Sequence, residues 1–339
     1  MPIAIVRVFF LASLLVLGLI ADTRIRGHGR LQAPGDADGG PSGQALPPAA
    51  GAERAPPRLI FGLGPAAQSA MSYKLNQDAI LGMYTTWYNK PEDLEWMSDW
   101  RESTIPAIYA SGRAAHLVIW SDVPEGGTPC GRPYPISDGI NGDMEALARI
   151  WAGTAADPPL YVTLFTEFQT FPCIDNQWLG AEEYYGRLQR KMVEIKDIFH
   201  RFAPNARVSI GWGGWQLRWD DTSDGAGRSL LKHFDSVMRQ MDFQSFQAMH
   251  DEGNANDVRA MTRALGPYGP VMLAHYKPQH QTVSTYIEDI SIMLTEDFLA
   301  DLSADGLFAW SFMDTAQMSR YPGIYESIRD AVTAYGRQP

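Results

Sequence analysis

Basic residues are scarce in this chain of 339 residues, and its main body contains no long run of them. Lysine and arginine together number 28, against 39 aspartates and glutamates, so the formal net charge is −11. A protein that binds nucleic acid needs clustered lysine and arginine to neutralise phosphates. The composition therefore argues against nucleic acid as a partner.

Cysteine is nearly absent as well, since the chain contains only Cys130 and Cys173. Neither has another cysteine or a histidine at the spacing of a metal site, so we expect no metal and no cofactor. Two cysteines suit a single disulfide in an oxidising compartment, with two free thiols as the alternative. Both residues fall in loops predicted at one end of the fold, and we expect a bridge between them.

The one long hydrophobic run lies at the start of the chain. Val8–Ala21 is almost unbroken in its apolar character and follows Arg7, a pattern typical of a signal peptide. We expect residues 1–22 to be a signal peptide or, alternatively, a membrane anchor. Residues 23–57 are rich in proline, glycine and alanine and are expected to form a disordered linker. A signal peptide and a membrane anchor both predict export, so we expect a secreted or periplasmic protein. Membrane contact is expected only through residues 1–22.

A glycine-rich phosphate-binding turn is also missing. A doubly wound sheet would normally show one after an early strand, and Phe61-Gly62-Leu63-Gly64 is too short a match. Strand-like and helix-like segments alternate from residue 58 onward. The expected strands are 58–64, 79–88, 114–122, 160–169, 207–215, 242–250, 270–277 and 306–314. Eight such repeats predict that residues 58–339 form a single (β/α)8 TIM barrel, which we expect to be a monomer.

The segment 160–169 carries a single carboxylate, Glu167, near its end. The segment is apolar, β-branched and aromatic, as in a buried strand, and a parallel barrel keeps its chemistry at the carboxyl ends of its strands. A glutamate pointing into solvent is the ordinary alternative. Burial among Phe165, Phe168 and nearby tryptophans would keep Glu167 protonated near neutrality, which favours a role as general acid.

Because the strands of a barrel end on one face, the residues at those ends are expected to form one site. Aromatic planes stack on sugar rings, and carboxylates bind hydroxyls or perform acid–base chemistry. The expected substrate-binding residues are Tyr84, Trp87, Trp120, Gln169, Trp212, Trp215, His250, His275, Tyr276, Lys277, Trp310 and Asp314. Asp251, Glu252 and Asp122 are candidates for a second catalytic carboxylate. This set predicts a polysaccharide or oligosaccharide substrate.

Residues 58–315 resemble the TIM-barrel glycoside hydrolases of clan A, most closely family 26, the β-mannanases and their relatives. The segments that carry the resemblance are Leu59–Gly62, Gly82–Tyr84 with Trp87, Asp138–Gly139 with Asp143, Tyr184–Asn205 and Trp310–Phe312. The resemblance implies that Glu167 is the acid/base glutamate. It also implies that Trp310 stacks against the sugar in the subsite beside the cleaved bond.

Two positions depart from the family pattern. Thr166 stands where the family usually has a histidine, and Ala274–Lys277 lacks the nucleophilic glutamate that the clan carries at the end of the seventh strand. Either the second carboxylate has moved to form a pair about 5 Å apart (retaining) or about 6.5–9.5 Å apart (inverting), or hydrolysis has been lost. The sequence thus predicts an exported glycoside hydrolase with Glu167 as general acid/base; the alternative is a non-catalytic carbohydrate-binding barrel. A cofactor-dependent enzyme with Lys277 as a Schiff-base lysine has no support.

Overall fold

The computed structural model describes residues 56–120, 134–168, 178, 181–219, 229–278, 283–313 and 315–339. These residues belong to one compact unit, Arg54–Pro339. The expected signal peptide and nearly all of the expected linker lie outside them. No helix in these ranges is long and apolar enough to cross a membrane.

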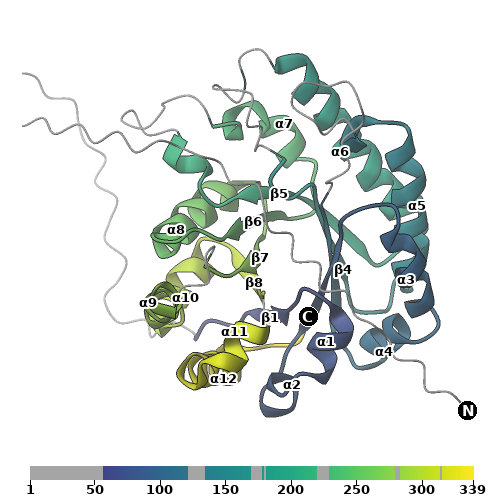
Figure 1. Ribbon diagram of the computed structural model, residues 1–339. Coiled ribbons are helices and arrows are strands. Elements are labelled where there is room, and N and C mark those ends of the chain that lie inside the picture. Colours follow the sequence, from purple (N-terminus) through teal and green to yellow (C-terminus); the bar gives the residue numbers. More distant parts are fainter. Residues whose placement is uncertain are drawn as a thin grey trace, which may run out of the picture. The chain divides into compact units, whose positions relative to one another are not determined.

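Eight parallel strands close into a barrel in the order β1 to β8 (Figure 1). The strands are β1 Ile60–Leu63, β2 Met83–Tyr88, β3 Ala114–Ile119, β4 Leu160–Leu164, β5 Ala206–Gly213, β6 Gln244–Ala248, β7 Val271–Tyr276 and β8 Leu307–Phe312. Seven of them lie within segments that the sequence predicts as strands, β5 begins one residue before its predicted segment, and the TIM barrel is confirmed. Nearly every strand residue is buried because helices cover the outside and side chains fill the inside.

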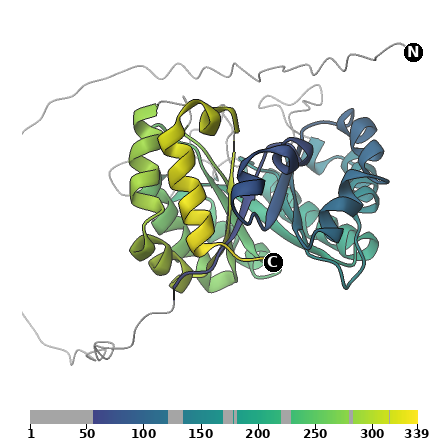
Figure 2. The ribbon, with the colours of Figure 1, turned by 90° about the horizontal axis from the view of Figure 1, so that it is seen from below.

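Helices alternate with the strands and surround the barrel (Figures 1 and 2). They are α1 Ala67–Ser72, α2 Leu75–Asp78, α3 Asp93–Trp100, α4 Thr104–Ala110, α5 Gly139–Trp151, α6 Glu182–Phe202, α7 Asp235–Met238, α8 Asn254–Leu265, α9 Val283–Met293, α10 Glu296–Ala304, α11 Thr315–Arg320 and α12 Pro322–Tyr335. Two helices rather than one connect β7 to β8, because Thr295 adopts an extended backbone and starts α10. The acidic residues Glu296 and Asp297 in the first turn suit that new helix start.

The barrel interior is layered. At the amino ends of the strands an apolar cluster includes Tyr161, Phe243 and Phe308, whose ring centroids lie 5.4–5.9 Å apart. Above it, His116 lies between two threonines, with Nδ1 3.1 Å from Thr85 Oγ1 and Nε2 3.0 Å from Thr163 Oγ1. Because hydroxyls satisfy both ring nitrogens, this buried histidine needs no charged partner.

We expect this interior to make the barrel acid-sensitive. Burial lowers the pKa of His116 and of His275 from an ordinary value of 6.5 to about 3 in each case. The unfolded chain therefore binds protons at these histidines below about pH 6.5 while the folded chain does not, so stability is complete above that pH and falls as the pH drops. Each histidine contributes up to about 1.4 kcal/mol per pH unit.

The measurement is the free energy of unfolding in urea between about pH 7 and pH 5. The variant His116→Gln should lose one histidine's share of the pH dependence. An unchanged slope in this variant would show that His116 is charged in the folded state or does not titrate on unfolding.

Candidate active site

A strained turn presents Glu167 at the mouth of the barrel. The strand predicted over 160–169 ends at Leu164, and Phe165 and Glu167 then adopt positive φ angles of 53° and 59°. A positive φ angle in a residue other than glycine costs about 1–3 kcal/mol of folding free energy. Such a conformation persists only where the surrounding structure holds it. Here the Thr166 N–H donates to the Ile119 carbonyl at 3.1 Å, and the Phe168 N–H donates to the Phe165 carbonyl at 2.9 Å. The half-buried Glu167 carboxylate therefore projects from a turn with a fixed backbone.

Gly211 on β5 lets this turn pack closely against the barrel. A Cβ atom at Gly211 would lie 2.9 Å from Thr166 Cα and 3.0 Å from Thr163 Cγ2. The first of these contacts is with backbone, so it cannot be relieved by rotating a side chain. Glycine at this position thus helps to fix where Glu167 lies.

We predict that Gly211→Ala displaces the Glu167 turn without removing a polar group. The added methyl group should destabilise the fold by about 1–3 kcal/mol, as overpacked cores do. Gly142→Ala is the control, because a Cβ there meets nothing within 4 Å. Thermal melts of both variants measure the effect. Equal melting temperatures would contradict the close-packing explanation.

Three side chains from different parts of the barrel form a hydrogen-bonded chain at the mouth. Gln247 of β6 donates from Nε2 to Oε1 of Glu167, and its own Oε1 contacts Nε2 of His275 on β7. Gln247 and His275 are buried. Burial, together with His116 and Lys277, lowers the pKa of His275 to about 3, so its imidazole is neutral. This hydrogen-bonded chain holds one oxygen of Glu167 from β6 and β7.

A bulge on β7 explains why His275 faces inward. Phe246 pairs with Leu273 while the next residue, Gln247, pairs with His275, so Ala274 is an extra residue on β7. The insertion reverses the alternation of side chains beyond it. Tyr276 consequently faces outward, where its hydroxyl donates to Asp289 Oδ2 at 2.8 Å.

Two tryptophans lie next to the hydrogen-bonded side chains of Glu167, Gln247 and His275. The Trp87 ring lies 4.8 Å from the His275 ring and 6.2 Å from the Trp120 ring, which is stacked on it at 26°. Both tryptophans are partly exposed. A flat, partly exposed aromatic surface next to a carboxylate can bind the C–H face of a sugar ring.

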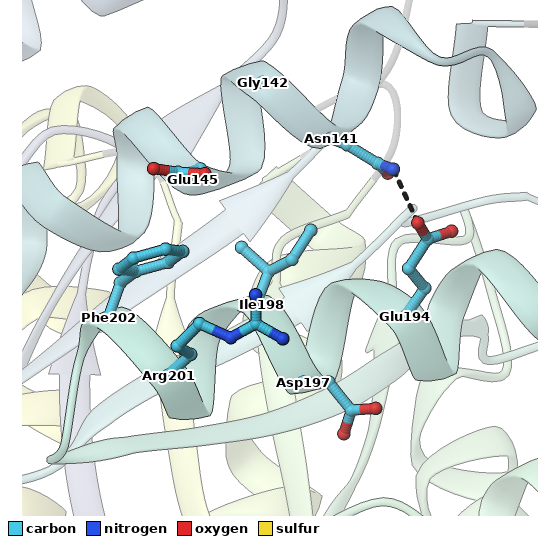
Figure 3. Close-up of a pocket in the computed structure, with 8 residues that line it drawn as sticks. All are labelled: Asn141, Gly142, Glu145, Glu194, Asp197, Ile198, Arg201 and Phe202. Atoms are coloured by element: carbon cyan, nitrogen blue, oxygen red, sulfur yellow. Dashed lines mark hydrogen bonds between the residues drawn. The ribbon is translucent and has the colours of Figure 1, made fainter.

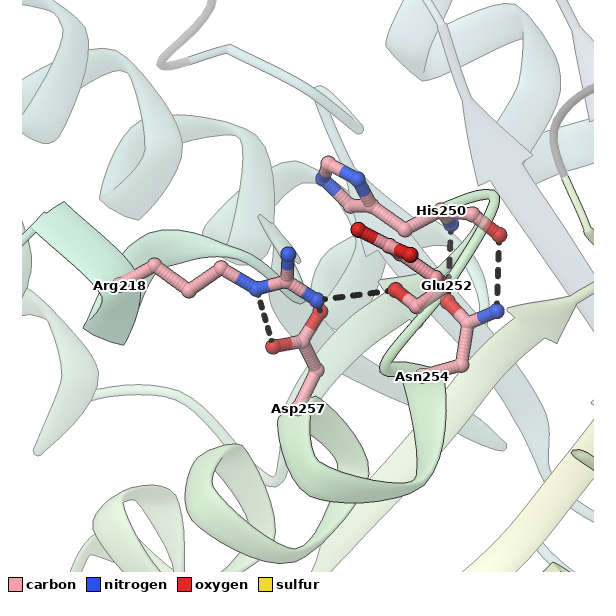
Figure 4. A network of polar contacts seen from close by, with 5 residues as sticks. All are labelled: Arg218, His250, Glu252, Asn254 and Asp257. Carbon is pink, nitrogen blue, oxygen red and sulfur yellow. Dashed lines mark hydrogen bonds and ion pairs between the residues drawn. The ribbon is translucent and has the colours of Figure 1, made fainter. Parts of the chain in front are cut away.

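A second cluster fixes the loop after β6 (Figure 4). Arg218 donates from Nε and Nη2 to the two oxygens of Asp257 at 2.7 and 2.8 Å, and from Nη2 to the Glu252 carbonyl at 3.1 Å. Burial, and then the Arg218 charge, lowers the pKa of His250 below its ordinary value. The Trp215 ring lies 5.4 Å from that histidine, and both are partly exposed. Asp251 and Glu252 are on this loop, and Arg218 holds its backbone through the Glu252 carbonyl.

Four predicted substrate-binding residues are core residues instead. Their exposed fractions are 0–1%, too little for contact with a sugar: Tyr84, Trp212, Tyr276 and Trp310. Their side chains point between the barrel and the helices, because alternate strand residues face outward. Tyr84 donates to Asn76 Oδ1 at 2.7 Å, Trp212 packs between Phe168 and Phe234, and Trp310 packs on Phe61, Tyr276 and Phe312.

Apart from His275, the remaining predicted residues divide into two groups. Partly or fully exposed residues at the strand ends are Trp87, Trp120, Glu167, Trp215, His250, Asp251, Glu252 and Lys277. Outside the described ranges lie Asp122, Cys130, Gln169, Cys173 and Asp314. His275 is buried, so the prediction of direct substrate contact is wrong, and it contacts Gln247 instead. Gln247 lies near the end of the sixth predicted strand and is expected at this rim, but without a catalytic or substrate-binding role; it faces inward, as Ser245 does two residues earlier on β6.

A surface hollow of about 350 Å³ lies on the outer helical layer (Figure 3). Its lining residues come from α5 and α6 alone, and Asn141 donates to Glu194 Oε1 at 2.6 Å across it. Arg149 pairs with Glu145 at 2.8 Å and lies over the Phe202 ring. No strand-end residue lines this hollow, so it is separate from the candidate site.

Within the described ranges, no group of three or more His, Cys, Asp or Glu could hold a metal ion.

Comparison with known proteins finds likeness in structure alone. No family model matches the chain, and no curated protein matches it. The chain is similar to a family 26 β-mannanase from Bacteroides ovatus at 14% identity, covering 81% of this chain and 87% of that one with a TM-score of 0.55. It is also similar to a psychrophilic family 10 endo-β-1,4-xylanase at 10% identity, covering 76% and 86% with a TM-score of 0.52. At these identities the likeness shows a shared fold.

Proposed function

We propose that this protein is a glycoside hydrolase that cleaves O-glycosidic bonds in a polysaccharide, with Glu167 as general acid/base. The observation that carries the proposal is the placement of Glu167. A strained turn presents its carboxylate at the carboxyl end of β4, Gln247 holds one oxygen, and partly exposed Trp87 and Trp120 lie at the same mouth. The fold shared with a β-mannanase and a xylanase supports the same function.

The proposed chemistry begins with proton transfer from Glu167 to the glycosidic oxygen, which breaks the bond to the anomeric carbon. The strand β7, Val271–Tyr276, contains no aspartate or glutamate, so it offers no carboxylate nucleophile. We therefore assign the attack to a water molecule activated by a second carboxylate, Asp251, Glu252 or Asp122. This assignment predicts inversion at the anomeric carbon.

The second candidate function is a barrel that binds carbohydrate without cleaving it. The specific observation in its favour is the neutral imidazole of His275 on β7, where clan A enzymes carry a carboxylate. The aromatic pair Trp87 and Trp120 would serve this function equally well.

The deciding experiment incubates the protein with β-mannans, β-glucans, galactans and bacterial exopolysaccharides. New reducing ends measure hydrolysis, and calorimetry on the same substrates measures binding. Turnover on any substrate supports the hydrolase, and the anomer first formed shows whether the configuration is inverted. Binding without turnover across the panel would support the non-catalytic barrel.

We also propose export, supported by the apolar segment Val8–Ala21. Cell fractionation tests it, and a cytoplasmic location would contradict it.

A bridge between Cys130 and Cys173 remains a prediction. Titration of the unreduced protein with a thiol reagent tests this bridge, and two reactive thiols would contradict it.

A further inference from the structure

We infer that Gln247 and His275 are positioning residues for Glu167: Gln247 donates to Oε1 of the carboxylate, and His275 holds Gln247 in the orientation that this bond needs. The inference rests on the proposed function of Glu167 as general acid/base. It gives the seventh strand a role although that strand lacks a carboxylate.

The first step is the orientation of the Gln247 amide. This side chain is buried, and its nitrogen and its oxygen each have one partner, Glu167 and His275 respectively. The amide nitrogen faces Oε1 of Glu167, and that oxygen accepts the hydrogen bond whether Glu167 is ionised or holds its proton on the other oxygen. The amide oxygen then faces His275 and needs a donor there.

The second step is the tautomer of His275. To donate to the Gln247 oxygen, its Nε2 must carry the proton. Its Nδ1 is buried and has no hydrogen-bond partner in the described part of the chain. A charged imidazole would leave a buried N–H unsatisfied, so the neutral form with a bare Nδ1 fits this site. The other charged or titratable groups that act on this ring are His116 and Lys277, and both disfavour its protonation.

The third step is the effect on Glu167. The ring of His275 packs edge-on against Trp87, 4.8 Å between centroids, and is thus fixed in place. A fixed donor orients Gln247, and Gln247 orients the carboxylate on its strained turn. The bond to Oε1 stabilises ionised Glu167 after it has given up its proton.

The kinetic test uses Gln247→Leu and His275→Leu, which remove the bonded groups, and His275→Gln, whose amide N–H can replace the Nε2 donor. The two leucine variants should lose up to about 100-fold in kcat with KM changed little, because misplacement affects the chemical step. The alkaline limb of their pH–rate profile, where the general acid Glu167 loses its proton, should move to higher pH. His275→Gln should recover most of the loss, and His116→Gln, a second buried histidine, should keep kcat and the position of the limb.

A second readout is nitrogen NMR of the His275 ring, which needs no activity. We expect a neutral ring protonated at Nε2 near neutral pH, with the Nε2–H resonance shifted in Gln247→Leu. A ring protonated at Nδ1, a charged ring, or unchanged kcat in the leucine variants overturns the inference. If wild-type protein turns over no substrate, the proposed function fails, and the ring tautomer alone then decides whether the hydrogen-bonded chain exists.

Discussion

Replacing Glu167 by glutamine is expected to reduce turnover by a factor of roughly several hundred or more, with binding of the oligosaccharide largely kept. Glutamine has the shape of glutamate and can still accept a hydrogen bond from Gln247, so the turn and its contacts should remain. The change removes the transferable proton. The measurements are kcat and KM on the best substrate of the panel, with a thermal melt to show that the fold is intact.

Glu145→Gln is the matched control, because this exposed carboxylate lies on α5 and, within the described part of the chain, pairs only with Arg149. It should leave kcat unchanged. Asp251→Asn and Glu252→Gln, measured beside it, identify the second carboxylate. Full turnover in Glu167→Gln, with a loss in Asp251→Asn or Glu252→Gln, would move the general acid to the loop after β6.

The barrel could be predicted from the sequence because its signal is repeated. Each of eight apolar segments is followed by a helical one, so an error in one boundary does not change the count. Boundaries themselves were less certain. The prediction continued β4 through Gln169, whereas the strand ends at Leu164 and Glu167 lies in a turn with positive φ. An apolar run does not show where its backbone leaves the strand.

The direction of each side chain could not be predicted from strand position alone. Trp212 and Tyr84 face the helices through simple alternation, which the sequence would have allowed. Tyr276 and His275 exchange sides because of the bulge at Ala274, and no residue type in the sequence signals that bulge. Through alternation or through the bulge, four of the seven Trp and Tyr residues predicted to bind substrate belong to the core: Tyr84, Trp212, Tyr276 and Trp310.

The contacts of Glu167 were beyond sequence reasoning for a different reason. Gln247 is 80 residues from Glu167, and His275 is 28 residues from Gln247. Only closure of the sheet brings these three side chains together. The sequence could indicate which residues end strands, but not which of them meet across the barrel.

The largest stability effect is expected for Trp310→Ala. Trp310 has 0% of its surface exposed, and its ring packs 5.3 Å from Phe312, 5.7 Å from Tyr276 and 6.4 Å from Phe61. Removing a buried tryptophan leaves a cavity and typically costs about 3–5 kcal/mol. Urea unfolding should show a loss of this size. Carbohydrate affinity, measured on the fraction that remains folded, should change little.

Trp120→Ala provides the matched comparison, since Trp120 is partly exposed and stacks on Trp87 at the mouth. Here we expect the opposite result: affinity for an oligosaccharide falls by about 1–3 kcal/mol and unfolding changes little. The pair of variants separates a core aromatic from a binding aromatic on neighbouring parts of one barrel. If Trp310→Ala weakens binding while its unfolding free energy stays at the wild-type value, Trp310 contacts the substrate and its placement in the core is wrong.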